Sequence, residues 1–135
     1  MNFINKYVVT FALIATVICA SFFMAMEYFI TNGIYSMLLV SAILYAAFMF
    51  ILGMFIGSKD IYEGYIGLNY HLTTYAICNI VPLVLICTGL VTKFTYHHIF
   101  SIMLFWGVFT IPHIIAFITM RKRSIRGIDK KELFD

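Results

Sequence analysis

Four long apolar stretches, separated by short polar segments, dominate the pattern of this chain. They cover about residues 7–28, 35–56, 70–91 and 99–120. At a rise of 1.5 Å per residue, a helix of about 22 residues spans roughly 33 Å, which is enough to cross the hydrocarbon core of a bilayer. The pattern therefore predicts an all-α fold, an integral membrane four-helix bundle in a single domain that comprises residues 1–135.

The overall composition supports the same interpretation. Of the 135 residues, 63% are hydrophobic and only 11% are charged, and the mean hydropathy is +0.98. A soluble globular domain usually has about a quarter of its residues charged. A chain this apolar has too few polar residues to form a surface in contact with water. We therefore expect lipid to surround most of it.

The positions of the cations predict the orientation in the membrane. Residues 121–135 form a polar tail directly after the fourth apolar stretch, and Lys and Arg are enriched on the cytoplasmic side of membranes. If the helices alternate in direction, Lys93 is the one cation on the outer side. The other eight fall on the inner side: Lys6, Lys59, Arg121, Lys122, Arg123, Arg126, Lys130 and Lys131. We expect a multi-pass protein of the cell membrane with both termini in the cytoplasm.

The first apolar stretch contains two features that concern packing. Ala12, Thr16 and Ala20 recur every four residues, and small residues at this spacing allow two helices to approach closely. These three residues are predicted to face a neighbouring helix. Glu27 is the only charged residue within the first two apolar stretches, and its place near the outer end predicts a carboxylate exposed to the lipid headgroups.

Polar residues of the third stretch gather on one side of the predicted helix. His71, Thr74 and Cys78 follow helical spacing, and Asn79 lies beside them. Because polar groups at membrane depth need partners, this side is expected to face the interior of the bundle. With His113 of the fourth stretch, His71, Thr74 and Asn79 form a hypothetical intramembrane polar stripe. Hydrogen bonding between helices and a transport or ligand path both remain open for it.

The sequence predicts neither a cofactor nor a metal nor catalytic residues. His71 and His113 both fall in the inner half of the bundle, where two histidines can hold haem, but their depths differ by several ångströms. The three cysteines have no metal-binding or redox spacing. Because no hydrolase, phosphate-binding or paired-carboxylate motif is present either, we expect no enzyme.

The tail offers a candidate contact surface. Its cations are attracted to anionic lipid by about 1 kcal/mol each near the surface. Its apolar residues are not required for anchoring to lipid, and they favour contact with a cytoplasmic protein. The predicted partner-contact residues are Arg121, Lys122, Arg123, Arg126, Ile128 and Leu133.

Two segments carry a resemblance to a known family. They are DIYEGYIGLNYHLTTYAI, which runs into the third helix and contains His71, and IPHIIAFITMRKRSIRGIDKKEL, which ends the fourth. With the four-helix layout, they resemble small membrane proteins of unknown biochemistry that are encoded beside LytTR-type transcription regulators in Firmicutes. The residues that match the family's C-terminal pattern are Ile125, Ile128, Asp129, Lys130 and Leu133. The chain departs from that pattern because Asp129 replaces the usual Asn and the first segment lacks the common tryptophan.

The resemblance implies a regulatory function. Members of such systems are thought to restrain a LytTR-type DNA-binding protein at the membrane, so this chain is expected to act as an inhibitory partner of a cytoplasmic regulator without binding nucleic acid itself. The alternatives are a small oligomeric channel or transporter and an immunity or toxin-type membrane protein. The expected partners are thus the lipid bilayer, the regulator and further copies of the chain.

Overall fold

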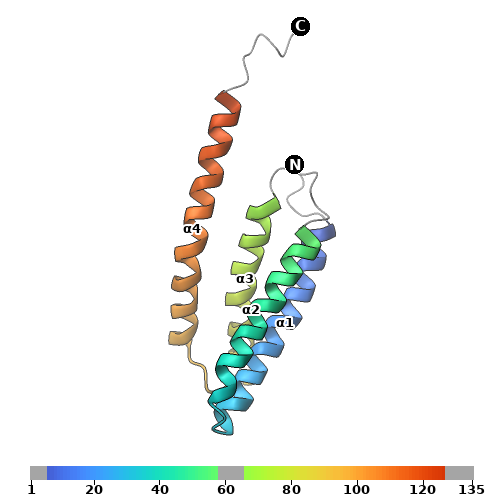
Figure 1. Ribbon diagram of the computed structural model, residues 1–135. Coiled ribbons are helices and arrows are strands. Elements are labelled where there is room, and N and C mark those ends of the chain that lie inside the picture. The colour runs from blue at the N-terminus through green and yellow to red at the C-terminus, as the bar shows by residue number, and fades with distance from the viewer. Residues whose placement is uncertain (1–5, 58–65, 127–135) are drawn as a thin grey trace.

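The computed structural model describes residues 6–57 and 66–126, which form only helices and the turns that connect them (Figure 1). The predicted all-α fold is therefore confirmed for these residues. Two predicted contact residues, Ile128 and Leu133, lie outside the described residues. The helices are α1 (Lys6–Thr31), α2 (Ser36–Gly57), α3 (Ile66–Cys87) and α4 (Tyr96–Arg126).

Among the described residues, three helices are long and apolar enough to cross a membrane. These segments are Lys6–Thr31 in α1, Ser36–Ile56 in α2 and Asn69–Cys87 in α3. Membrane crossing by α4 stays a prediction from the sequence. The helix is longer than the predicted stretch 99–120, because it begins at Tyr96 and continues to Arg126.

A glycine follows each of the helices α1 and α3 and ends it. Gly33 and Gly89 have φ values of 71° and 74°, in the left-handed region. After α3, the N–H of Leu90 donates to the carbonyl of Leu85 at 3.0 Å, and the N–H of Gly89 donates to that of Ile86 at 3.0 Å. This is a Schellman motif, which satisfies the last carbonyls of the helix. It explains why α3 ends at Cys87 rather than at the predicted residue 91.

The helices pack in the order α2, α1, α3, α4. α1 packs against both α2 and α3, and α4 packs against α3. α2 meets α3 only slightly, and the contact between α2 and α4 is weaker still. The connections that follow α1 and α3 lie at the same end of the molecule (Figure 1). The described helices thus form a bundle that is open on one side, between α2 and α4.

The packed side of α1 overlaps the predicted one only in part: Ala12 and Ala20 are partly buried against the core, but its centre lies elsewhere. Phe11, Ala15, Cys19 and Phe23 are buried at intervals of four residues, and Cys19 Sγ lies 4.0 Å from the carbonyl oxygen of Ile77 on α3. Small side chains at Ala15 and Cys19 thus permit the close approach, one position before the predicted series. Thr16 is exposed, and its hydroxyl donates to a carbonyl of its own helix at 2.8 Å. The prediction that Thr16 faces a neighbouring helix was therefore wrong.

Candidate functional site

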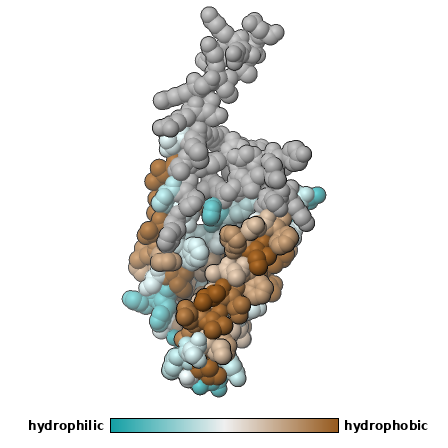
Figure 2. Space-filling model, viewed as in Figure 1, coloured by the Kyte–Doolittle hydropathy of each residue, from teal (hydrophilic) through white to brown (hydrophobic). Residues whose placement is uncertain are grey.

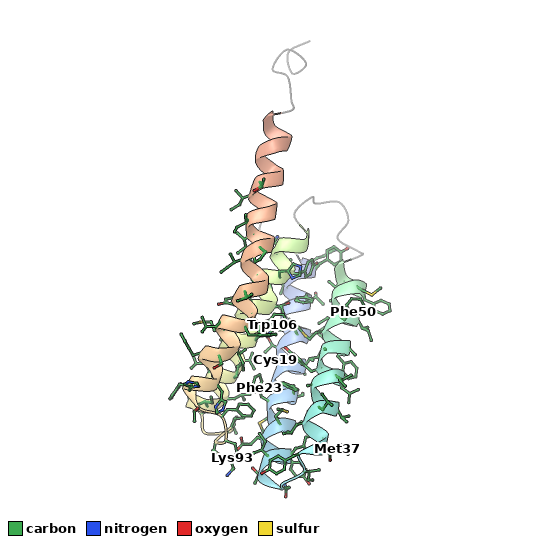
Figure 3. All side chains as sticks on the ribbon, turned by 60° about the vertical axis from the view of Figure 1, so that its left-hand side comes forward. Cys19, Phe23, Met37, Phe50, Lys93 and Trp106 are labelled. Atoms are coloured by element: carbon green, nitrogen blue, oxygen red, sulfur yellow. The ribbon has the colours of Figure 1, made fainter. Side chains whose placement is uncertain are left out.

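A lateral groove with a volume of about 530 Å³ lies where the bundle is open. All four described helices line it. Phe11 of α1 and Trp106 of α4 contribute one aromatic ring each, and α2 contributes an apolar wall between Tyr45 and Met54. Trp106 and Phe50, labelled in Figure 3, lie on the two helices that flank the opening. The groove is the natural candidate site because residues from every helix meet there.

Two residues of the predicted polar stripe meet in this groove. His71 is exposed and Thr74 is half-buried, and both line it from α3. His113 belongs to the helical backbone of α4, but its side chain lies outside the described part of the structure. The structure therefore places one end of the predicted stripe, His71 and Thr74, in a site of largely apolar character.

Asn79 does not join them. Its side chain is half-buried and does not line the groove. Its amide Nδ2 donates to the carbonyl of Tyr75 at 2.6 Å, one turn earlier in the same helix. Its buried Oδ1 has no hydrogen-bond partner among the described residues. The hydrogen bond that the structure gives to Asn79 is thus internal to α3, whereas the sequence suggested a bond to another helix.

Tyr45 is a contact residue that the sequence analysis missed. Its hydroxyl lies 3.1 Å from Cys78 Sγ on α3. Its ring stacks on Phe22 of α1, with 4.6 Å between the ring centroids. Tyr45 therefore connects α2 to both neighbouring helices and also forms part of the groove wall. The signal in the sequence was a tyrosine in the middle of an apolar stretch, because a buried tyrosine hydroxyl usually has a hydrogen-bond partner.

Glu27 connects the end of α1 to the connection between α3 and α4. Its Oε1 accepts hydrogen bonds from the backbone N–H and the hydroxyl of Thr92, at 3.0 and 2.7 Å. Its Oε2 accepts one from the backbone N–H of Lys93 at 2.9 Å. The sequence suggested a carboxylate facing only headgroups, but this carboxylate binds a neighbouring turn. A charged acceptor forms stronger hydrogen bonds than a neutral one, so Glu27 has a structural role.

The cationic residues proposed for partner contact lie at the end of α4. The backbone is helical through Arg121, Lys122, Arg123 and Arg126, although their side chains lie outside the described part. Figure 1 shows this end of α4 extending past the first turn of α3. The backbone at these four positions is therefore far from the turns at Gly33 and Gly89.

Metal-binding groups and known relatives add no further site. Within residues 6–57 and 66–126, no group of three or more His, Cys, Asp or Glu side chains is placed to hold a metal ion. No protein-family model, curated protein or solved structure matches the chain. The relationship to LytTR-associated membrane proteins thus stays a prediction from the short sequence segments.

Proposed function

We propose that this protein spans the cell membrane with both termini in the cytoplasm and restrains a LytTR-type DNA-binding regulator at the inner surface. The observation that carries the proposal is the projecting end of α4. The regulator's class comes from the sequence resemblance, and the helix supplies a surface on which it would be held.

The surface of the helices supports the membrane part of the proposal. Large apolar side chains are exposed along them; Leu39 of α2 and Val17 of α1 have 70% and 66% of their surface accessible. Figure 2 shows such hydrophobic side chains over the described helices on one face. Soluble monomers rarely expose continuous apolar surface of this extent. Lipid would cover this surface favourably.

The arrangement of charged residues supports the orientation. Lys93 lies in the α3–α4 connection at the end of the bundle where α1 also turns into α2 (Figure 3). Lys6 begins α1 at the opposite end, and α4 runs toward that end with Arg121 and the cations after it. The positive-inside rule then assigns the end with many cations to the cytoplasm.

The length of α4 supports a contact with a cytoplasmic partner. α4 has 31 residues and α3 has 22, which correspond to about 46 and 33 Å of helix. α3 ends and α4 begins at the same end of the bundle (Figure 1), so the extra length of about 13 Å carries the other end of α4 past the start of α3. The last turns of α4 would therefore stand in the cytoplasm as a cationic helical arm.

The decisive experiment is affinity capture of the tagged protein from its native membrane. We expect a LytTR-type regulator in the eluate, and we expect it to be lost when Arg121 and Lys122 are both changed to Gln. The matched control changes Lys130 and Lys131 to Gln, which also removes two tail cations. Insertion of both variants is checked by reporter fusions. Retention of the regulator in both variants would refute the α4 arm as the contact.

The channel or transporter alternative makes the opposite prediction. A single four-helix chain leaves little room for a lumen, so a channel requires several copies. If no regulator is captured and the purified protein releases ions from liposomes, the restraint proposal is replaced by this alternative.

A further inference from the structure

We propose that the lateral groove between α2 and α4 binds one unbranched acyl chain of an amphiphile, with the polar head of that molecule at His71 and Thr74. This site is separate from the α4 arm. It does not depend on the identity of the captured regulator.

The dimensions of the groove suit a linear chain. Its volume of about 530 Å³ lies within the range of small-molecule sites, roughly 300–1,000 Å³. The wall formed by α2 extends from Tyr45 to Met54, which corresponds to about 14 Å along the helix axis. A slot of this length, open along one side, accommodates an extended alkyl chain better than a compact ring.

The side chains provide an apolar floor and open space above it. Phe11 packs edge-to-face against Tyr70, with 5.0 Å between ring centroids and an interplanar angle of 84°, so the floor is a fixed aromatic pair. On α2, Ala46 and Gly53 line the groove with minimal side chains. A Cβ added at Gly53 would meet no described atom within 4 Å. The hollow thus arises where small residues of α2 face the aromatic floor.

The location of the groove determines which molecules reach it. It opens between two helices, and α2 is a candidate membrane span over almost its whole length. In the orientation proposed above, the medium beside this opening is the acyl-chain region of the bilayer. A linear alkyl chain is therefore the chemical group most available to it, and each buried methylene contributes to its binding.

The polar residues lie at one end of the slot. His71 is five residues from the start of α3 at Ile66, about 8 Å along the axis, and it is exposed. The start of α3 is at the same end of the molecule as the N-terminus of α1 (Figure 1). His71 would thus lie near the inner headgroups, where an imidazole can donate a hydrogen bond to a carboxylate or phosphate oxygen. The polar residues would thus lie beside the headgroup of an amphiphile whose acyl chain extends along the apolar slot.

Trp106 provides a direct assay, because it is the single tryptophan of the chain and lines the groove. The purified protein in nanodiscs is titrated with a dibrominated fatty acid, whose bromines quench nearby indole fluorescence. We expect quenching that saturates near one molecule per protein and is reversed by the unbrominated fatty acid. In a parallel series, nanodiscs that contain brominated phospholipid test the bilayer's own lipid as the source of the chain.

Two neighbouring alanines of α2 form a matched pair for this assay. Ala46 lines the groove and Ala47 does not. We expect Ala46→Leu to raise the half-saturating concentration about tenfold or more, while Ala47→Leu leaves it unchanged. Gly53→Leu is a second groove-filling variant, and circular dichroism verifies that the variants remain helical.

A further pair of ligands tests the polar end. His71→Ala is expected to weaken binding of the brominated fatty acid several-fold and to leave binding of its methyl ester unchanged. Quenching that rises linearly with bromine content and is equal in the Ala46 and Ala47 variants would overturn the proposal, because it would report only contact with bulk lipid. Absence of quenching would also overturn it and would leave the groove to a second copy of the chain.

Discussion

At the scale of single residues, Glu27 shows how one carboxylate connects two distant parts of the chain. Its three shortest hydrogen bonds go to Thr92 and Lys93, which are 65 and 66 positions away in the sequence. It orders the α3–α4 connection beside Val91, a residue with 1% of its surface accessible. The stability of this end of the bundle therefore depends on a residue that the sequence pattern assigned to the membrane surface.

We expect Glu27→Gln to lower the free energy of unfolding by about 1 kcal/mol, because charge-assisted acceptors are replaced by one neutral acceptor and one donor. The measurement is unfolding of the purified protein in mixed micelles with increasing sodium dodecyl sulfate. Thr92→Val should act through the same contact, so the double variant should lose less than the sum of the two single losses.

Thr88→Val is the matched control for that measurement. Among the described residues, the hydroxyl of Thr88 donates to two carbonyls in the last turn of α3, those of Val84 and Leu85, at 2.9 and 3.1 Å. The loss of unfolding free energy caused by Thr88→Val should therefore add to the loss caused by Glu27→Gln. If the losses caused by Glu27→Gln and Thr92→Val were also additive, the contact between Glu27 and Thr92 would not contribute to stability.

At the scale of helices, the position of the close contact between α1 and its neighbours is the main result. Ala15 has no accessible surface, whereas the next residue, Thr16, is exposed. Ala15 therefore lies in the packed interior and Thr16 on the exposed surface, although the two residues are adjacent in sequence and are both small. A helix turns by about 100° per residue, so one step moves a side chain from the packed seam to the exposed side.

We expect Ala15→Leu to destabilise the protein by roughly 1–3 kcal/mol, because the added methylenes overpack the seam of α1. Thr16→Leu should change stability by less than about 0.5 kcal/mol, as substitutions outside the core usually do. Both variants are compared by the same micelle unfolding assay. If Thr16→Leu is the more damaging change, the predicted series Ala12, Thr16, Ala20 is the true contact and the packing described above is wrong.

At the scale of the whole molecule, the opposite ends of the bundle should lie on opposite sides of the membrane. We expect alkaline phosphatase to be active when fused after Asn32 and inactive when fused to the C-terminus, because this enzyme folds only outside the cytoplasm. A fluorescent protein at the C-terminus should be bright. A bright fluorescent fusion after Asn32 would contradict the topology, and so would an active phosphatase fused to the C-terminus.

The sequence predicted the elements well because apolar length and turn chemistry are local properties. The four apolar stretches all correspond to helices in the described residues, and a turn with Gly33 in the left-handed region separates the first two. The C-terminal end of α3 was displaced because Gly89 closes the helix before its apolar run ends. A run of Leu and Val after such a glycine looks helical by hydropathy but belongs to the connection.

The candidate site was predicted less completely, since it depends on how helices meet. His71 and Thr74 were identified from their polarity and are now found together in the groove. Phe11 and Trp106 were not identified, because apolar and aromatic residues in an apolar helix have no distinguishing sequence pattern. Tyr45 was missed although its hydroxyl in an apolar stretch was a signal. These residues are recognised as part of one site only because the tertiary structure places them around the same groove.

The sequence by itself determined the helical class and the expectation of a membrane environment, because these depend on hydrophobic length and composition. The order of packing α2, α1, α3, α4, the opening between α2 and α4, and the engagement of Glu27 by a distant turn were decided only by the tertiary structure. In a chain with apolar residues on every side of its helices, hydrophobicity does not distinguish packed from lipid-facing positions. Which positions are packed depends on how the shapes of the side chains on neighbouring helices fit together.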